Sequence, residues 1–333
     1  MLNSSKIMFL IIMIMGTFIV TSSTTWLSMW IGLEMNLMAF IPIIYKQNNP
    51  QTSESCMIYF LIQSMGSIIM LTTILMMTLI YTQPKFTEII LYTIMTTSMM
   101  IKLGIPPFHF WFPEIMNKMD WINCLILMTW QKIAPLSIMS NLMDKNYILP
   151  IMIIALSTIT GAIGGLSQTS IRKIMAYSSI NHMGWMIACM NFNQLWTEYL
   201  IIYSIIVMMM TAIFMLNSSF FMNQLNNKSP SIQKYAIMIT FMSLGGLPPF
   251  LGFLPKWMVI KSMIIAQSYS ILIVMIMSAL ITLFYYLRLT SHIFLLNNSS
   301  TKYNWKNSQK NMLILSFIVA FNIILPMTAI FSF

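Results

Sequence analysis

Long apolar runs recur from one end of the chain to the other, and each could cross a lipid bilayer as a helix. A spanning helix needs about 20 mostly apolar residues. Of the 333 residues, 58% are hydrophobic and 7% are charged, whereas soluble domains carry about 25% charged residues. So few charges could not cover the surface of a water-soluble globule of this size. The sequence therefore predicts an all-α, polytopic membrane protein.

We expect about eleven transmembrane helices, which form a single membrane domain over residues 1–333. Their predicted ranges are 4–22, 26–45, 56–80, 87–118, 121–142, 147–168, 172–190, 195–217, 235–268, 270–292 and 311–332. The spans 87–118 and 235–268 each contain a proline pair and are expected to be broken.

Basic residues concentrate in alternate loops, which predicts how the chain is oriented. One side of the membrane would collect Lys6, Lys46, Lys118, Arg172, Lys173, Lys228, Lys234, Lys302, Lys306 and Lys310. The other side would receive Lys85 and Lys145. The N-terminus is therefore expected on the positive side, which is the matrix in a mitochondrion, and the C-terminus on the opposite side.

The polar residues disfavour several classes of function. The net charge of +10 is not gathered into a patch with interleaved aromatics, so nucleic-acid binding is not expected. The three cysteines are Cys56, Cys124 and Cys189. They lack CxxC spacing, so neither an iron–sulfur cluster nor a disulfide framework is expected. The three histidines are His109, His182 and His292, and they lie too far apart in the sequence to indicate a haem or zinc site. No glycine-rich nucleotide fingerprint is present in the sequence.

The two broken spans contain similar sequences. They read Gly104-Ile-Pro-Pro-Phe-His-Phe-Trp-Phe-Pro113 and Gly246-Leu-Pro-Pro-Phe-Leu-Gly-Phe-Leu-Pro255. The two spans are five helices apart in the predicted order, so they cross the membrane in opposite directions. Broken helices at matching positions of an inverted repeat are typical of transport sites. We expect a first repeat at roughly 1–142, a second at roughly 147–292 and a C-terminal helix at 311–332; simple kinking for packing is the alternative.

Four ionisable residues fall near the midpoints of predicted spans. A charge at the bilayer centre costs at least about 2.5–3.5 kcal/mol, so each of them needs a reason to be there. The four residues are Glu34, Lys102, Lys132 and Lys256. Removal from water disfavours the charged form of a lysine, whereas a nearby carboxylate favours it. A glutamate that approaches or leaves a buried lysine would therefore change its proton affinity, which is the chemistry that proton translocation requires. Structural ion pairs or snorkelling side chains are the alternative.

Other polar residues are weaker candidates for the same path. His109, His182 and Lys173 could extend it, although packing or interfacial roles explain them equally well. Lys261 follows Lys256 by about a turn and a half and could face a polar interior. Gly161 and Gly165 form a GxxxG pattern, which predicts a close helix contact rather than a site.

Several longer motifs resemble a known family. They are Trp30-Ile-Gly-Leu-Glu-Met-Asn36, Pro106-Pro-Phe-His-Phe-Trp-Phe-Pro113, Met128-Thr-Trp-Gln-Lys-Ile-Ala-Pro135, Gly161-Ala-Ile-Gly-Gly-Leu-Ser-Gln-Thr169, Met175-Ala-Tyr-Ser-Ser-Ile-Asn-His-Met-Gly184 and Leu244-Gly-Gly-Leu-Pro-Pro-Phe-Leu-Gly-Phe-Leu-Pro-Lys256. Together they resemble the antiporter-like membrane subunits of respiratory NADH:ubiquinone oxidoreductase (complex I), the family that includes the mitochondrially encoded subunit 2.

The resemblance implies a proton-translocating subunit of the complex I membrane arm, driven by redox chemistry in other subunits. Glu34 and Lys102 match the family's glutamate–lysine pair, Lys132 its connecting lysine and Lys256 its exit-side lysine. It implies a multi-pass protein of the mitochondrial inner membrane with its C-terminus in the intermembrane space. Neighbouring antiporter-like and small membrane subunits, together with phospholipids, would be its partners. NADH, FMN, iron–sulfur clusters and ubiquinone would be bound by other subunits, so no cofactor and no metal is expected here.

Two other functions fit the residues taken alone. One is a stand-alone antiporter that exchanges cations and protons, because it would share the repeat plan. The other is a scaffold subunit whose buried charges are static pairs. The number of protons moved and the event that drives proton release do not follow from the sequence.

Overall fold

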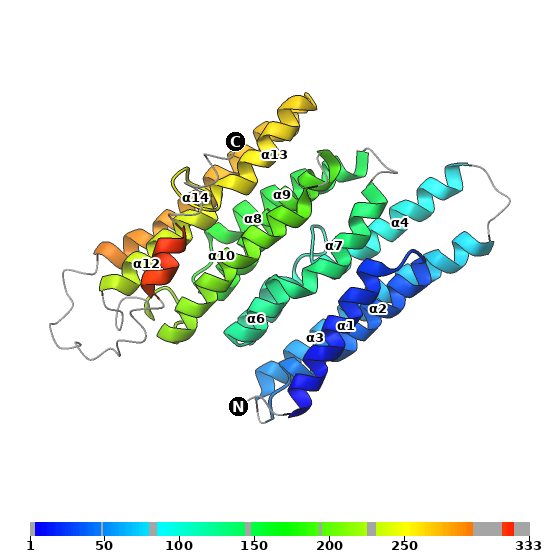
Figure 1. Cartoon of the computed structure of the whole chain (residues 1–333), viewed down its shortest axis with the longest axis horizontal. Helices are drawn as coiled ribbons and strands as arrows, with labels where there is room; N and C mark the ends of the chain where they lie inside the picture. Colours follow the sequence, from blue (N-terminus) through cyan, green and yellow to red (C-terminus); the bar gives the residue numbers. More distant parts are fainter. Residues whose placement is uncertain are drawn as a thin grey trace. The chain divides into compact units, whose positions relative to one another are not determined.

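The described part of the chain is almost entirely helical. The computed structural model describes residues 4–47, 49–79, 85–143, 148–192, 195–224, 231–295 and 315–322. Extended pairing within these ranges is limited to one isolated antiparallel bridge, between Ser170 and Phe221. The predicted all-α class is therefore confirmed (Figure 1). The chain divides into two compact units, Met1–Leu156 and Ser157–Phe333.

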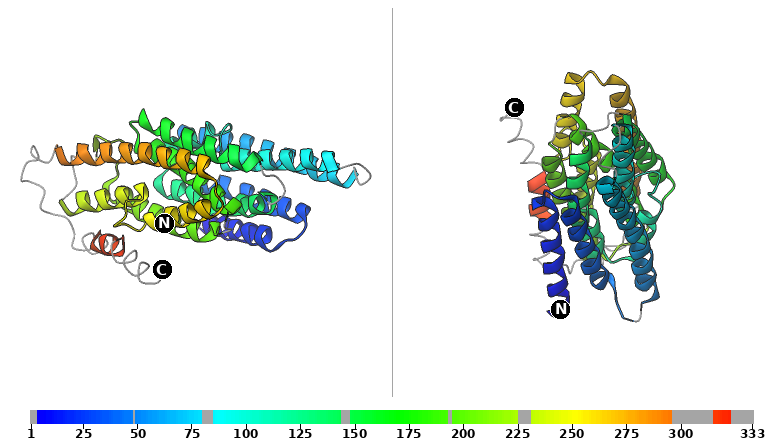
Figure 2. Two further views of the ribbon diagram at one scale, coloured as in Figure 1. Left: turned by 90° about the horizontal axis from the view of Figure 1, so that it is seen from above. Right: turned by 90° about the vertical axis from the view of Figure 1, so that its right-hand side faces the viewer.

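The helices of the first unit follow the predicted spans. They are α1 (Ser4–Ser22), α2 (Trp26–Ile44), α3 (Pro50–Leu79), α4 (Lys85–Leu103), α5 (Trp111–Lys118), α6 (Trp121–Met128) and α7 (Trp130–Met143). The next helix, α8 (Ile148–Leu166), begins in this unit and ends in the second. Helices α1 and α2, dark blue in Figures 1 and 2, run side by side, and α3 packs against both α2 and α4.

The second unit is built around α9. Its further helices are α9 (Ile171–Phe192), α10 (Trp196–Asn217), α12 (Ser231–Gly245), α13 (Phe253–Ile265) and α14 (Tyr269–Leu295), and residues 315–322 are also helical. Helix α9 is buried along almost its whole length and packs against α10, α13 and α14. Because other helices surround α9, it can carry polar side chains such as Asn181 and His182 without presenting them to lipid.

Within the residues that the structure describes, seven helical segments are long and apolar enough to cross a membrane. They are Ser4–Ser22, Trp26–Ile44, Pro50–Leu79, Trp121–Met143, Leu149–Leu166, Trp196–Asn217 and Tyr269–Ser291. The predicted spans 87–118, 172–190 and 235–268 coincide with α4–α5, α9 and α12–α13, which are broken or more polar. The predicted helix at 311–332 lies outside the described residues except for 315–322. The total of eleven spans and the division into repeats therefore stay predictions.

The predicted span 121–142 is interrupted at Thr129. This residue separates α6 from α7 with φ −115° and ψ −71°, and its hydroxyl donates to the Leu125 carbonyl at 2.7 Å. A threonine hydroxyl that bonds back to the preceding turn competes with the backbone and bends helices. The interruption was not predicted, and it places Gln131 and Lys132 in the first turn of α7.

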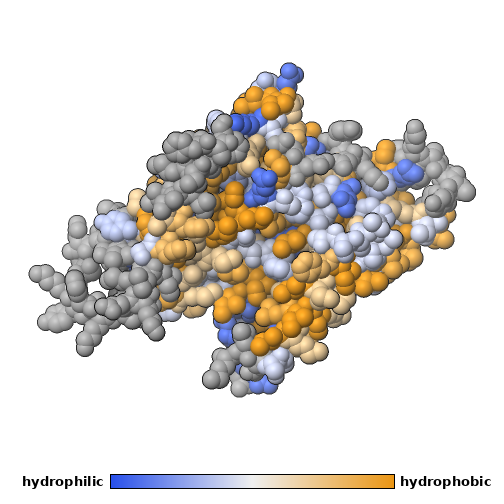
Figure 3. All heavy atoms as spheres, in the orientation of Figure 1, coloured by the Kyte–Doolittle hydropathy of each residue, from blue (hydrophilic) through white to orange (hydrophobic). Residues whose placement is uncertain are grey.

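Large apolar side chains are exposed on many helices of both units. Phe18 is 62% exposed, Met65 64% and Phe284 60%. Figure 3 shows orange, hydrophobic residues over much of the face it draws, with blue residues in small groups. Soluble proteins rarely expose apolar surface on this scale. The surface therefore agrees with a membrane protein.

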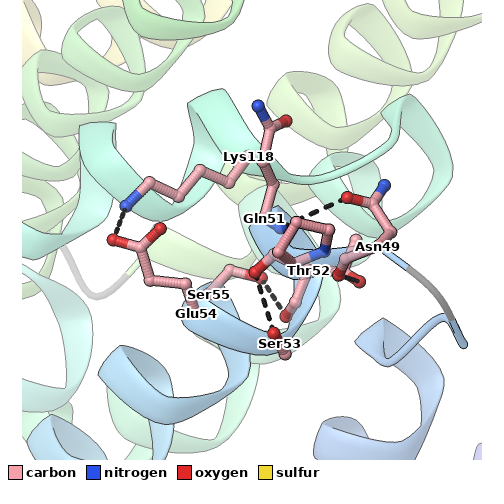
Figure 4. Close-up of polar contacts among 8 residues, drawn as sticks. Asn49, Gln51, Thr52, Ser53, Glu54, Ser55 and Lys118 are labelled. Atoms are coloured by element: carbon pink, nitrogen blue, oxygen red, sulfur yellow. Dashed lines mark hydrogen bonds and ion pairs between the residues drawn. The ribbon is translucent and has the colours of Figure 1, made fainter.

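Two ion pairs tie the ends of helices together in the first unit. Lys118, the last residue of α5, pairs with Glu54 in α3 (Figure 4), and Lys46 pairs with Asp120. Both lysines were predicted on the same side of the membrane, and both pairs link the α2–α3 region to the α5–α6 turn. They hold the α5 end of the broken helix α4–α5 close to the connection between α2 and α3.

The predicted close contact at Gly161 is confirmed. A Cβ atom at this position would lie 2.6 Å from the Asn181 backbone nitrogen and 2.9 Å from its Cα. A Cβ at Gly165 would lie 2.8 Å from the Tyr285 ring. These distances leave no room for a side chain, so the backbones of α8 and α9 approach each other directly.

We therefore expect Gly161→Ala to force α8 away from α9 and to destabilise the second unit by about 1–3 kcal/mol, the usual effect of overpacking. Thermal unfolding of the purified protein in its native assembly measures this. Ile163→Ala is the matched control on the same helix, because Ile163 is 57% exposed on the apolar surface. An unfolding temperature that falls equally in both variants would contradict the close contact.

Candidate functional site

The first broken helix ends in a closed turn next to Lys102. Gly104 adopts a left-handed conformation with φ +68°. The amide of Gly104 donates to the Ile101 carbonyl at 3.3 Å, and that of Ile105 to the Met100 carbonyl at 3.0 Å. This pair of bonds is the Schellman motif, which satisfies the last carbonyls of a helix. Gln63 on α3 covers one more carbonyl, because its Nε2 donates to the Lys102 oxygen at 3.0 Å.

The second broken helix ends in the same turn. Gly246 has φ +75°; its amide donates to the Ser243 carbonyl at 3.0 Å, and that of Leu247 to Met242 at 3.3 Å. The sequence similarity of the two segments thus reflects a shared backbone structure. Both segments break the helix as predicted, and the turn at each break satisfies two of the carbonyls at the helix end, as an apolar environment favours.

The lysines occupy different places at the two breaks. Lys102 lies in the last turn of α4, before its break, whereas Lys256 lies in the first turn of α13, after its break. The Lys256 ammonium reaches back to donate to the Gly245 carbonyl at 2.8 Å and lies over the Trp185 ring, 5.7 Å from its centroid. Lys256 therefore caps the carbonyl end of the half-helix α12, where the helix dipole favours a positive charge.

A small cavity in the first unit connects Lys102 with Lys132. It has a volume of about 20 Å³, and Lys102, Lys132, Asn36, Tyr59, Gln63 and Gln131 supply its polar side chains. A cavity of about 10–15 Å³ or more can hold a water molecule. The two lysines are 6% and 3% exposed, so both side chains that line this cavity are almost fully buried.

Glu34 does not line this cavity, although Leu33, the residue before it on α2, does. Glu34 is half-buried, and its charge acts on Lys102. Among the described residues the two form no ion pair, so Glu34 influences Lys102 through space rather than by direct contact. The structure thus brings three of the four predicted residues into the first unit and places Lys256 in the second.

The weaker candidates have different surroundings. His182 is buried on α9, where its Nδ1 lies 2.9 Å from the Tyr199 hydroxyl and its ring 5.0 Å from that of Tyr203. His109 lies half-buried within the first break, beside Phe110.

Lys173 and Lys261 are less buried than the central lysines. Lys173 is half-buried in the first turn of α9. The expectation that Lys261 could face a polar interior was wrong, because its side chain is exposed. Its ammonium lies 5.7 Å from the ring centroid of Trp257, four residues earlier on α13. The aromatic face gives the charge a partner at the surface.

The uncharged part of the site was not predicted from the sequence. Asn36, Tyr59, Gln63 and Gln131 are polar residues within apolar helices, and three of the four engage each other. The available signals were their polarity, the adjacency of Gln131 to Lys132 and the position of Asn36 two residues after Glu34. Within the described residues no group of three or more His, Cys, Asp or Glu is placed to hold a metal ion.

Comparison with known proteins identifies the family. A family model described as "NADH:quinone oxidoreductase/Mrp antiporter, TM" matches residues 23–282, which is more than half of the chain. The NADH-ubiquinone oxidoreductase chain 2 of Anopheles gambiae is 44% identical over 316 residues, covering 92% of this chain and 91% of that protein. The chain belongs to the NADH-ubiquinone oxidoreductase chain 2 family. The resemblance found in its motifs is thereby confirmed.

Solved structures share the fold of this family member. A chain of respiratory complex I from Thermus thermophilus has a TM-score of 0.82 at 19% identity, covering 96% of this chain and 76% of that one. A chain of the Mrp complex from Dietzia sp. DQ12-45-1b has a TM-score of 0.78 at 15% identity, covering 86% of this chain and 60% of that one. At these identities the likeness concerns the fold alone.

The geometry of the second break predicts a stability difference between neighbouring glycines. A Cβ at Gly246 would lie 2.7 Å from Lys256 Cδ and 3.0 Å from its ammonium nitrogen. A side chain in the left-handed region also costs about 1–2 kcal/mol. We expect Gly246→Ala to lower the stability of the assembled protein by at least that amount, as measured by its thermal unfolding.

Gly245→Ala is the matched control. Its Cβ would have its nearest neighbour at 3.5 Å, an ordinary contact, and the residue is helical. Equal unfolding temperatures for Gly246→Ala and Gly245→Ala would contradict the arrangement of Lys256 on the turn.

Proposed function

We propose that this chain translocates protons within the membrane arm of NADH:ubiquinone oxidoreductase. The observation that carries the proposal is the placement of Lys102 and Lys132, two almost fully buried lysines, on the wall of one water-sized cavity. A buried ammonium and a buried amine that share such a cavity can exchange a proton through it. A static scaffold has no need of two buried cations at one cavity, where they repel each other.

Each of the four charged residues has a role in this proposal. Glu34 adjusts the proton affinity of Lys102 through space, and Lys102 exchanges protons with Lys132. Lys256, held at the carbonyl end of α12, is the exit-side residue of the second unit. When the charge near a buried lysine changes, the balance between its charged and neutral forms changes too. Moving one proton against about 100 mV requires about 2.3 kcal/mol, which is within the range of such effects.

The driving reaction is proposed to occur in other subunits. NADH, FMN, iron–sulfur clusters and ubiquinone would be bound outside this chain, which would act as one subunit of an enzyme without a redox site of its own. Other membrane-arm subunits, including neighbouring antiporter-like and small membrane subunits, are the proposed partners, together with phospholipids against the exposed apolar surface.

The proposed location is the mitochondrial inner membrane. The N-terminus would lie in the matrix and the C-terminus in the intermembrane space, as the distribution of basic loops predicts. The family relationship supports a respiratory subunit over a stand-alone antiporter, because the 44% identity is to a chain 2 protein. Co-purification with a complex that oxidises NADH tests this choice directly.

Replacement of Lys102 tests proton translocation. We expect Lys102→Met to keep the apolar stem and remove the proton carrier. Loss of a positioned acid or base slows proton transfer by about 10²–10⁴-fold. Translocation through this chain should therefore stop, and the number of protons moved per NADH oxidised by the assembled complex should fall.

The matched control is Lys261→Met, since Lys261 is exposed and does not line the cavity. Proton-pumping assays in membrane vesicles, with NADH oxidation followed in parallel, measure the ratio. If the Lys102→Met complex assembles and pumps with the ratio of the unaltered complex, the scaffold alternative is correct.

A further inference from the structure

Gln131 is the residue in which the polar contacts around the cavity converge. Its Oε1 accepts from the Tyr59 hydroxyl at 3.3 Å, and its Nε2 donates to Asn36 Oδ1 at 3.0 Å and approaches the Met13 sulfur at 3.3 Å. These partners lie on α1, α2 and α3, whereas Gln131 lies on α7. Both ends of the amide are therefore occupied, which fixes the direction in which it points.

Two of these hydrogen bonds form a series in which the donors all point the same way. Tyr59 donates to Gln131, and Gln131 donates to Asn36, so the Asn36 oxygen is occupied and its NH₂ group remains as a donor. Asn36 is 3% exposed and lines the cavity. Within the described residues its NH₂ group donates to no protein atom. The chain of bonds therefore ends in a donor at the cavity wall.

Lys102 presents a second donor to the same space. Its side chain is 6% exposed, and its ammonium group donates to no acceptor among the described residues. A buried ammonium without an acceptor is strongly unfavourable. The cavity of about 20 Å³ beside it is large enough for one water molecule, whose oxygen can accept from Lys102 and from Asn36 together.

We propose that Gln131 is a positioning residue for proton transfer, which orients one water molecule between Lys102 and Lys132 by fixing the Asn36 amide. This inference rests on the proposed proton translocation. With its oxygen accepting from Lys102 and Asn36, the water has its own hydrogens available for the other wall of the cavity, where Lys132 lies.

The transfer step balances without any other reactant. An N–H bond of the Lys102 ammonium breaks as an O–H bond forms on the water. An O–H bond of the same water breaks as an N–H bond forms on the neutral amine of Lys132. Lys102 ends as an amine, Lys132 as an ammonium, and the water is regenerated. If the Gln131 amide turned over, Asn36 would turn with it and present an acceptor, which would orient the water the opposite way.

The test compares four variants in the assembled complex, of which Lys132→Met removes the proposed second proton carrier and serves as the reference. Gln131→Leu keeps the approximate volume and removes the amide. Tyr59→Phe keeps the ring packing on Phe40 and Trp111 and removes only the donor that orients Gln131. Ser137→Ala is the control on α7, because its hydroxyl bonds only to the Ala134 carbonyl of its own helix.

The readouts are the protons moved per NADH oxidised and the solvent deuterium isotope effect on translocation. A misplacement of about 1 Å can slow a reaction by about 10²-fold. We expect Gln131→Leu to lower the proton ratio nearly as far as Lys132→Met does and to raise the isotope effect on the translocation that remains. Tyr59→Phe should lower the ratio less and raise the isotope effect, and Ser137→Ala should leave both unchanged.

Three results separate this inference from its alternatives. A Gln131→Leu complex that is less stable but has an unchanged isotope effect would show a merely structural residue and overturn the proposal. A normal ratio in Gln131→Leu, with a lowered ratio in Lys132→Met, would overturn the role of Gln131 while proton translocation stands. A normal ratio in Lys132→Met would instead contradict the proposed function itself. If Gln131→Leu does not assemble, Tyr59→Phe decides by the same two readouts.

Discussion

Every polar group of this chain that lies inside the bilayer has to find its partner within the protein, because hydrocarbon offers none. The two helix breaks show how the backbone meets that requirement. Each break ends in a left-handed glycine, Gly104 or Gly246, whose turn satisfies two of the last carbonyls of its half-helix. One carbonyl that the following prolines leave without a backbone donor accepts from a side chain instead, Gln63 at the first break and Lys256 at the second. The breaks are thus stable features of the fold, and they let charged side chains approach the ends of half-helices far from bulk water.

The buried lysines meet the same requirement in two different ways. Lys256 is bonded to a backbone carbonyl at its own break, so its charge is held by the end of a half-helix. Lys102 instead faces a small polar cavity that it shares with Lys132, under the influence of Glu34. A charge held by a fixed carbonyl is confined to one place, whereas a charge beside a water-sized cavity can be passed on. This contrast agrees with transfer in the first unit and with a terminal position for Lys256.

The four ionisable residues could be predicted from the sequence because charges are rare in apolar helices. Glu34, Lys102, Lys132 and Lys256 stood out for that reason, and three of them are buried in the structure. The two helix breaks could be predicted because each contains a proline pair. The neutral part of the site could not be predicted in the same way. Asn36, Tyr59 and Gln131 belong to it because they form hydrogen bonds between α2, α3 and α7, and the sequence does not show which helices are neighbours. The interruption at Thr129 was missed because threonine is common in continuous helices, and the exposure of Lys261 because spacing along a helix does not reveal which face is covered.

The central claim is that the buried lysines change protonation while the complex works. Infrared difference spectroscopy of the assembled complex, with isotope-labelled lysine, follows the ammonium bands as NADH is oxidised. If these lysines carry protons, a lysine ammonium signal appears during turnover and is lost in the Lys132→Met complex, with NADH oxidation still proceeding. Lysine bands that stay constant during proton-pumping turnover, or a signal that persists unchanged without Lys132, would contradict it.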